Sequence, residues 1–311
     1  MNLSEISRLS EDQARECFEK IRWPHGPVCP HCGSVESRKL QGKAHRQGLY
    51  DCYGCQGQFT ATVDTILEDS HLPIRTWLMA FSILCSAKKG VSALQLQRQL
   101  GLGSYRTAWH LCHRIRHAMD REPLKGLLGV AGGTVEADES WVGGKPRKRA
   151  GKRARLGTFE RKRIPTKTRI VALVERGGRA RAHVVPDLTA PTLKAAVRAH
   201  VDPSARLMTD ENHAYAGLGK EFAGGHEVVN HSKYEYTRGD ATTNTVEGFF
   251  GLFKRGVMGS FHHISEKHMD RYLNEFSFRW DLRKVTDSER TVEVIKAVEG
   301  KRLMYRVPVG K

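Results

Sequence analysis

The chain has 311 residues, enough for two or three domains, and its 39% content of hydrophobic residues supports a folded core. Lysine and arginine outnumber aspartate and glutamate by 51 to 34, which gives a formal net charge of +17 at pH 7. This basic excess points to nucleic acid as the partner. The sequence has no long apolar run and no secretory pattern in its first ten residues, so we expect a cytoplasmic protein without a membrane partner.

The first 70 residues predict a short helix followed by a small metal-binding ribbon. Cys29 and Cys32 form one C-x-x-C pair, and Cys52 and Cys55 form a second pair nineteen residues further on. Two such pairs at this distance are typical of a structural zinc site with four thiolate ligands. We therefore expect one Zn²⁺, which supplies folding free energy that so small a core lacks. The expected elements are a helix before Pro24 and strands at 49–53 and 59–63.

Residues 71–122 predict a helix-turn-helix segment. Apolar residues recur at helical spacing, and the glycine-containing turn at residues 101–103 separates two helices. In such a motif the second helix can enter a DNA groove. A plain helical bundle is the alternative. The side chains predicted to contact DNA are Arg106, His110 and Arg114.

Strand and helix signals alternate in residues 130–285. Three early strands are followed by helix, strand, helix, strand and a long helix, which is the order of a ribonuclease H-like α/β domain. A C-terminal tail at 286–311 completes a multidomain chain. The expected strands are 134–142, 169–175, 179–185, 206–209 and 227–230, and the first helix of this domain is expected at 189–200.

Three acids fall within the first of these strands, where apolar side chains are usual. Asp138 lies in this strand, and Asp210 ends the later apolar run at 207–209, at the carboxyl end of a buried strand, a position where sheets hold ligands. With Glu247 from a later helix, they would form an oxygen-rich site suited to Mg²⁺ or Mn²⁺. A surface charge or an ion pair with arginine is the alternative for any acid, and we expect it for Glu139 and Glu211.

Glu247 and Lys254 lie seven residues apart on an amphipathic helix. Seven residues make about two turns, so the two side chains point the same way. A carboxylate that binds metal, next to a lysine that can contact phosphate, indicates phosphate chemistry. An ordinary pair on a solvated helix face is the alternative. The roles of Glu136 and of Asn244, one turn before Glu247, are left open.

A basic tract adds to the evidence for nucleic acid. Residues 145–163 contain ten lysines or arginines and one acid, and they include few apolar side chains. Such a segment is expected to bind the phosphate backbone, and surface solubility is the alternative. The predicted contacts are Lys145, Arg147, Lys148, Arg149, Lys152, Arg153, and, from the later helix, Lys254 and Arg255.

Four sequence stretches resemble those of ISXO-type insertion-sequence transposases, DDE enzymes that carry an N-terminal zinc ribbon. They are TVEADESWVGGK from residue 134, MTDENHAY from 208, VNHSKYEY from 229 and TNTVEGFFGLFKRG from 243. The resemblance extends over nearly the whole chain, from the cysteine pairs to residues 272–276 and Arg279. It implies a ribonuclease H-like core with Asp138, Asp210 and Glu247 as metal ligands and Lys254 at the transposon-end DNA. The family motif is also described with asparagine as its third member, so Asn244 remains an alternative.

We therefore expect a metal-dependent DNA transposase that cleaves at transposon ends and transfers the freed strand into target DNA. Its partner would be double-stranded DNA, both the terminal inverted repeats and the target. Joining two ends implies a homodimer or higher oligomer on DNA, and a prokaryotic copy would lie at the nucleoid. The alternatives are a non-catalytic DNA-binding regulator, such as a domesticated transposase, and a nuclease without strand transfer.

Overall fold

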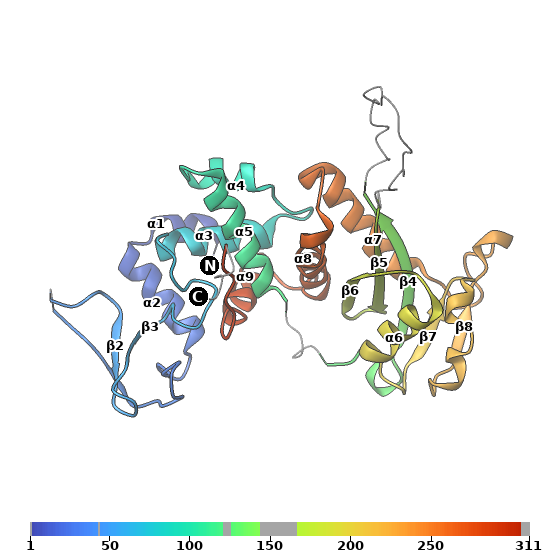
Figure 1. The fold of residues 1–311 in the computed structure, drawn as a ribbon, viewed down its shortest axis with the longest axis horizontal. Helices are drawn as coiled ribbons and strands as arrows, with labels where there is room; N and C mark the ends of the chain where they lie inside the picture. Colours follow the sequence, from blue (N-terminus) through green and yellow to red (C-terminus); the bar gives the residue numbers. More distant parts are fainter. Residues whose placement is uncertain (1, 43, 121–125, 144–166, 306–311) are drawn as a thin grey trace, which may run out of the picture. The chain divides into compact units, whose positions relative to one another are not determined.

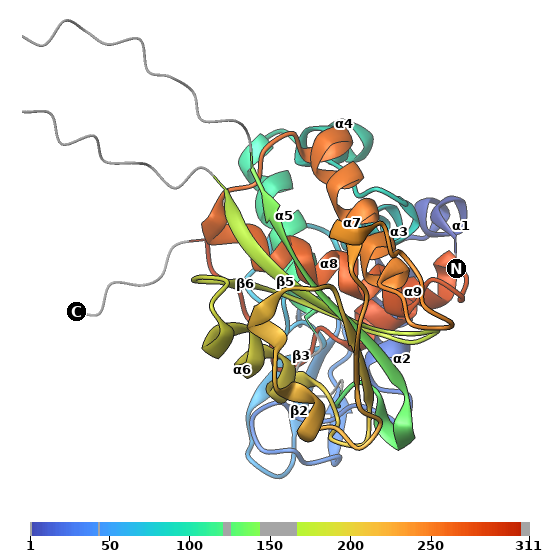
Figure 2. The same ribbon diagram turned by 90° about the vertical axis from the view of Figure 1, so that its right-hand side faces the viewer.

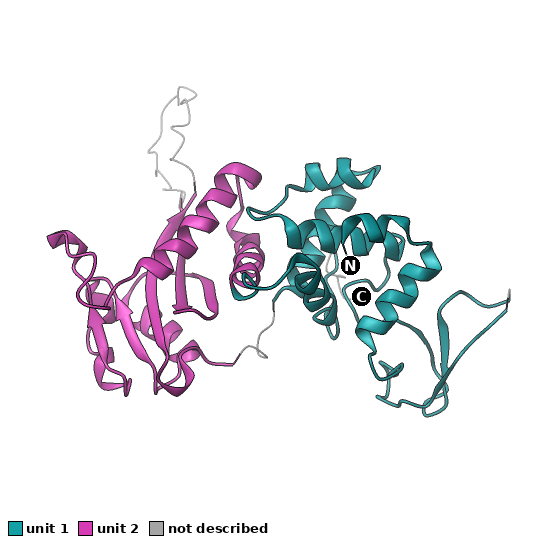
Figure 3. Cartoon of the chain, turned by 180° about the vertical axis from the view of Figure 1, so that it is seen from behind, with its two compact units in different colours: residues 1–125, 281–311 teal, residues 126–280 magenta. Residues whose placement is uncertain are grey.

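The structure of the protein is a computed structural model that describes residues 2–42, 44–120, 126–143 and 167–305. It divides into two compact units (Figure 3). Unit 1 comprises residues 1–125 and 281–311, and unit 2 comprises residues 126–280. The chain thus leaves unit 1, forms unit 2 and returns. Among the described residues, no helix combines the length and the apolar character that a membrane crossing requires.

Unit 1 begins with the helices α1 (Leu3–Arg8) and α2 (Glu11–Arg22). Ser10 caps α2: its hydroxyl accepts the N–H of Gln13, and the Gln13 side chain accepts the N–H of Ser10. This reciprocal pair satisfies two backbone donors that a helix start otherwise leaves without partners. The helix ends directly before Trp23 and Pro24, so the predicted helix is confirmed.

A three-stranded antiparallel sheet follows, with the order β1 (Ser37–Lys39), β2 (Leu49–Cys52) and β3 (Gln58–Thr60). The last strand is shorter than predicted because the chain turns after Thr60, whose carbonyl accepts the N–H of Val63 at 3.1 Å. Trp23 packs edge-on against both Tyr50 and Phe59, with ring centroids 5.6 and 5.8 Å apart. These aromatic rings form the small core that joins the sheet to α2.

The remaining helices of unit 1 are α3 (Ile74–Ser86), α4 (Ala93–Leu100), α5 (Tyr105–Ala118) and α9 (Asp287–Lys296). The turn between α4 and α5 starts at Gly101, which adopts φ +64°, a left-handed conformation that glycine takes without strain. The predicted helix, glycine turn and helix are confirmed at these positions.

The segment after α9 returns to the region that follows β3. Glu299 pairs with Thr65 in a β-bridge, and the buried Arg22 donates to Glu299 at 3.2 Å. Arg22 also donates to the carbonyls of Ala61 and Val63. The residues after α9 therefore stabilise the segment that follows β3 in unit 1.

Unit 2 is built on a five-stranded sheet with the order β6-β5-β4-β7-β8. The three strands β4, β5 and β6 pair antiparallel, whereas β7 and β8 continue the sheet in parallel from β4. Figures 1 and 2 show this sheet from two directions. The strand bounds are β4 (Thr134–Val142), β5 (Thr168–Glu175), β6 (Ala180–Val185), β7 (Arg206–Thr209) and β8 (His226–Val228), close to those expected.

Helices cover both faces of the sheet. One face packs against α6 (Ala190–His200), and its core includes Leu193 and Val197. The opposite face packs against α7 (Asn244–Gly256) and α8 (Met269–Asp281), and its core includes Phe253 and Phe276. Side chains alternate along a strand, so β4 contributes Val135 and Ala137 to the face that packs against α6. The alternate residues Glu136 and Asp138 lie on the face that packs against α7.

Candidate active site

Two aspartates lie side by side on neighbouring parallel strands. Ala137 of β4 is the register partner of Thr209 of β7, and Asp138 and Asp210 are the next residues along. The Oδ1 of Asp138 accepts the N–H of Glu139 at 2.7 Å, and the Oδ1 of Asp210 accepts the N–H of Asn212 at 3.1 Å. These bonds fix the orientation of both carboxylates. The sheet register therefore brings together two of the three predicted ligands.

Asp138, Glu139 and Asp210 form a carboxylate cluster. One oxygen of each lies within 4.8 Å of the others, and all three residues are half-buried. Burial, aided by the charges of Asp210 and Glu139, raises the pKa of Asp138 to about 7. Burial also raises the pKa values of Asp210 and Glu139. Because these like charges repel one another, the cluster favours a cation with a preference for oxygen ligands.

Glu139 accepts hydrogen bonds from two residues that the sequence did not identify as its partners. We expected a surface charge or an arginine partner, and this prediction is wrong. Its Oε2 accepts the hydroxyl of the buried Tyr215 at 2.8 Å, and its Oε1 accepts the side-chain amide of Asn212. Both partners follow Asp210 closely in the chain, which was the available signal. Glu139 thus joins the segment after β7 to β4.

Glu136 joins β4 to the start of α7. Its carboxylate is fully buried, and its Oε2 accepts the backbone N–H groups of Thr245 at 2.7 Å and Val246 at 3.0 Å. Its Oε1 accepts the Thr245 hydroxyl and the Nε of Arg176. Arg176 also donates to the carbonyls of Asp240 and Thr242, which lead into the helix. A buried carboxylate thus satisfies the first donors of α7 and favours its dipole.

Glu247 follows this anchored turn of α7. Its Oε1 accepts the hydroxyl of Thr243 at 3.1 Å and lies 3.8 Å from the Nδ1 of His231. Glu247 lies outside the group of three carboxylates within 4.8 Å, but its charge contributes to the raised pKa of Asp138. The structure therefore places Glu247 close enough to act on Asp138 electrostatically.

The polar face of α7 is exposed from Asn244 to Arg255. Glu247 and Lys254 are both exposed on this helix, and the Nζ of Lys254 lies 5.7 Å from the ring centroid of Phe250. A Cβ at Gly248 would lie 3.8 Å from Trp280, an ordinary contact. Packing within the described residues therefore leaves room for a side chain at this glycine.

The four paired cysteines come together in unit 1. Their sulfur atoms all lie within 4.8 Å of one another, with 3.7 Å between Cys29 and Cys55 and 3.6 Å between Cys32 and Cys52. A tetrahedral zinc site with Zn–S bonds of about 2.3 Å has sulfur–sulfur edges of roughly 3.8 Å. Backbone N–H groups, first that of Cys55, lower the pKa of the Cys52 thiol to about 6. The four thiols fit a zinc ion.

Comparison with known proteins finds a matching domain for the region of the carboxylate cluster and another for the region of the four cysteines. Residues 130–281 match the ISXO2-like transposase domain, and residues 9–58 match the transposase zinc-ribbon domain. The chain therefore contains an ISXO2-like transposase domain and a transposase zinc-ribbon domain. Over 285 residues it is 27% identical to a protein of Halobacterium salinarum described as an uncharacterized protein in transposable element ISH50. That alignment covers 88% of this chain and 92% of the relative.

The transposase resemblance expected from the sequence is thereby confirmed. The first matched range contains Asp138, Asp210 and Glu247, and the second contains all four zinc-ribbon cysteines. Transposase domains imply DNA as the partner of this chain.

The helix-turn-helix of this transposase offers fewer groups to DNA than predicted. Arg106 is exposed on the first turn of α5. Arg114 is buried, donates to the carbonyl of Glu68 and lies over the ring of Trp77. His110 is half-buried and is hydrogen-bonded to the carbonyl of Leu303. Of these three predicted contacts, only Arg106 is exposed. The prediction failed for the other two because the sequence pattern does not show which face of α5 packs.

The basic-tract residues predicted to bind DNA, Lys145, Arg147, Lys148, Arg149, Lys152 and Arg153, lie outside the described residues. Lys254 and Arg255 are described, and both are exposed on α7.

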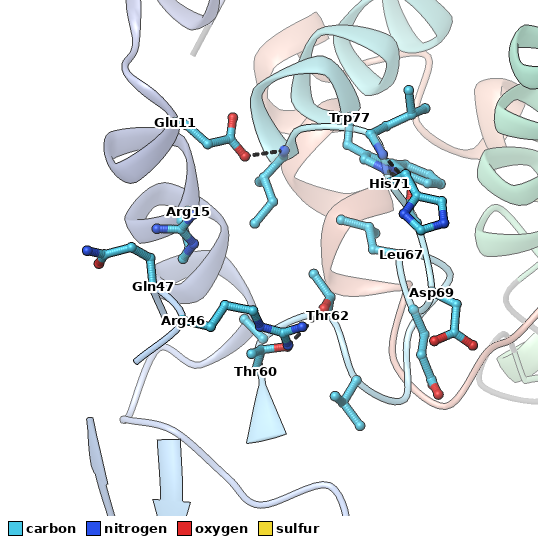
Figure 4. Close-up of a pocket in the computed structure, with 16 residues that line it drawn as sticks. Glu11, Arg15, Arg46, Gln47, Thr60, Thr62, Leu67, Asp69, His71 and Trp77 are labelled. Atoms are coloured by element: carbon cyan, nitrogen blue, oxygen red, sulfur yellow. Dashed lines mark hydrogen bonds between the residues drawn. The ribbon is translucent and has the colours of Figure 1, made fainter. Parts of the chain in front are cut away.

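Unit 1 of the transposase also contains a cavity of about 460 Å³ between α2 and the segment that leads into α3 (Figure 4). Arg15 and Arg46 line it, but so do Glu68 and Asp69, so its charge favours no class of ligand. Glu11 at its edge already accepts the N–H groups of Ile74 and Arg75 at the start of α3. The cavity is thus part of the packing between α2 and α3.

Proposed function

We propose that unit 2 is a ribonuclease H-like DDE domain that cleaves DNA at transposon ends and transfers the freed strand into target DNA. The neighbouring positions of Asp138 and Asp210 on β4 and β7, inside the matched transposase domain, carry this proposal. The strand order supports it, because three antiparallel strands, a helix and two parallel strands follow the expected order. The helix expected between β7 and β8 is replaced by two short 3₁₀ turns, His213–Tyr215 and Leu218–Lys220.

The proposed ligands of Mg²⁺ or Mn²⁺ are Asp138, Asp210 and Glu247. The fit rests on the half-buried carboxylates of Asp138 and Asp210, whose mutual repulsion a divalent cation would relieve, and on the charge of the exposed Glu247, which adds to the effect of burial in raising the pKa of Asp138. Such a cation activates an attacking oxygen and stabilises the leaving oxygen in a phosphoryl displacement. Asn244 is the alternative to Glu247, but a neutral amide would offset less of the cation's charge.

Backbone and side-chain contacts of the protein hold the proposed metal ligands in place. Backbone N–H groups hold the carboxylates of Asp138 and Asp210, and Glu136 fixes the helix that carries Glu247. Lys254 would bind a phosphate of the transposon end two helical turns further along. Since the displaced oxygen is replaced directly by the attacking one, no covalent protein intermediate is needed.

Unit 1 would recognise the terminal repeats. The zinc ribbon would take part in this recognition, and Arg106 on α5 is exposed and available to a DNA groove. Because two ends have to be joined, the active form on DNA would contain at least two copies of the chain.

A joining assay tests the proposal. Inverted repeats in the DNA that flanks the gene would define a labelled end substrate, which is incubated with supercoiled target DNA and Mg²⁺. A transposase gives a labelled product joined to the target. A nuclease gives only the shortened end, and a regulator binds the end without cleaving it. Either of the last two results would refute strand transfer.

A further inference from the structure

The loop of residues 230–238, between β8 and α7, presents two exposed tyrosines beside the carboxylate site. Tyr234 is 83% exposed and Tyr236 is 56% exposed. Tyr236 packs edge-on against His231, with ring centroids 5.3 Å apart, and His231 in turn lies beside Glu247. This aromatic loop is therefore adjacent to the proposed third metal ligand.

Carboxylates hold the aromatic loop in one conformation. Glu211, directly after Asp210, accepts the N–H groups of His231 at 2.8 Å and Ser232 at 3.0 Å. The carboxylate of Glu235 accepts the N–H of Asn230 at 3.1 Å. We expected Glu211 to be a surface charge or a partner of arginine, and this prediction is wrong. Its carboxylate connects the loop to the end of β7, where Asp210 lies.

Tyr234 adopts an unusual backbone conformation within this fixed loop. Its φ of 60° and ψ of 21° are left-handed, a region that bulky side chains rarely occupy. The N–H of Tyr234 donates to the carbonyl of His231 at 3.0 Å, so the turn is closed at that residue. An aromatic ring is thus presented to solvent by a closed turn rather than by an extended chain.

Two basic side chains lie in the same loop as Tyr234. Lys233 and Arg238 are both exposed, and Arg238 also donates to the carbonyl of Val228 and lies 3.8 Å from Glu235. Exposed aromatic rings next to cations bind single-stranded nucleic acid, because bases stack on the rings and phosphates pair with the cations. Within a duplex, neighbouring base pairs cover the faces of each base. Only the outer face of a terminal base pair is free, so a base that stacks on Tyr234 within the transposon end and its flanking DNA has to be unpaired.

We propose that Tyr234 stacks on an unpaired nucleobase at the DNA end that the carboxylate site processes, an inference that rests on the proposed function of that site. Tyr236 supports the ring of His231, and Lys233 and Arg238 bind the phosphates on either side of the stacked nucleotide. The loop thereby holds the end of the strand next to Glu247.

Binding without cleavage tests this inference. The end duplex is prepared with a flush end or with two unpaired terminal nucleotides, and its affinity is measured by fluorescence anisotropy without added divalent cation. The wild type is expected to prefer the unpaired end. Tyr234→Asn should lose between about 5-fold and about 160-fold in affinity for that end. Asparagine tolerates the left-handed backbone, so the loop is retained. Tyr234→Phe, which keeps the ring, should retain the preference.

Two further variants serve as controls. Tyr105→Asn removes another exposed tyrosine, on α5, and should leave the preference between the two ends unchanged. Lys233→Ala should weaken binding to the unpaired end more than to the flush end, and should reduce the salt dependence of binding to the unpaired end.

A wild type without a preference for unpaired ends, or a Tyr234→Asn variant that keeps it, would overturn the inference and leave the joining reaction untouched. Loss of self-association in Tyr234→Asn, with end preference unchanged, would also overturn it, because the loop would then be a contact between copies. A wild type that prefers unpaired ends but joins no strands would instead refute the proposed function alone.

Discussion

Glu136 accepts the backbone N–H of Thr245 at 2.7 Å, and this bond joins the strand of Asp138 to the first turn of the helix of Glu247. The two residues are 109 positions apart in the chain. Asp138 lies two residues after Glu136, and Glu247 lies two residues after Thr245. The distance between the two proposed ligands therefore depends on this buried contact.

Replacing Glu136 with glutamine should impair both stability and strand transfer. Glutamine keeps one acceptor oxygen but leaves Arg176 without its charged partner and presents an amide to the N–H groups of α7. We expect a loss of about 1–3 kcal/mol in the free energy of unfolding, measured by urea denaturation. Strand transfer should fall more than end binding, because DNA contacts elsewhere are retained.

A double-mutant cycle with Arg176→Gln provides the control. If the two side chains act as one contact, the double variant should be more stable than the sum of the single losses predicts. Additive losses would contradict the coupling between them.

Folding stability should depend on pH through Asp138. The pKa of an aspartate in an unfolded chain is about 3.9, whereas that of folded Asp138 is about 7. Between these values the folded protein binds more protons than the unfolded chain, so its free energy of unfolding falls as pH rises toward 7. Mg²⁺ should restore stability at pH 8. Urea denaturation between pH 5.5 and pH 8 measures both effects.

Asp138→Asn should reduce this pH slope and the gain from Mg²⁺. Asp187→Asn is the matched control, because hydrogen bonds from Thr189 and Thr192 lower the pKa of Asp187 to about 2, far below the tested range. A slope that persists unchanged in Asp138→Asn would show that other groups cause it.

The sequence predicted the strands of unit 2 and the helices α6 and α7 because each has its own hydrophobic periodicity, but the helix expected between β7 and β8 is only two 3₁₀ turns. Apolar runs locate β7, and helical spacing locates α7. The role of Glu136 was not predictable, because its partners Thr245 and Arg176 come from distant parts of the chain. The place of Glu139 was missed for the same reason: alternation along a strand says nothing about Tyr215, which approaches after the chain has turned.

Zinc removal should expose Trp23. Its ring packs on Tyr50 and Phe59, which flank the cysteine pairs and have little other core to hold them. A strong chelator should release one zinc per chain, measured by metal analysis, and shift tryptophan fluorescence to longer wavelength. Trp23→Phe should still release zinc but lose most of that shift. A chelated protein with unchanged fluorescence would contradict a structural role for the metal.

Two glycines should respond oppositely to alanine. A Cβ at Gly224 would lie 2.7 Å from backbone atoms of Arg206, which cannot move without disturbing β7, so Gly224→Ala should lose about 1–3 kcal/mol. Gly248 lies inside α7 with room for a methyl group, so Gly248→Ala should gain about 1 kcal/mol. Urea denaturation compares them, and a destabilised Gly248→Ala would mean that α7 packs more tightly than described.

Helical periodicity could not show which face of α5 is free. The predicted contacts Arg106, His110 and Arg114 share the helix, yet Arg114 packs on Trp77 while Arg106 is exposed. The outcome depends on neighbours such as Leu303, which comes from the far end of the chain.

The central claim is that Asp138, Asp210 and Glu247 together carry the metal-dependent reaction. It is tested most directly by the rate of strand transfer in Mg²⁺ for Asp138→Asn, Asp210→Asn and Glu247→Gln, with Asp187→Asn, outside the carboxylate cluster, as the control. End binding by each variant verifies that it is folded. We predict that the first three variants bind ends but form no joined product, whereas Asp187→Asn joins at the wild-type rate. Joining by Glu247→Gln at the wild-type rate would contradict the account.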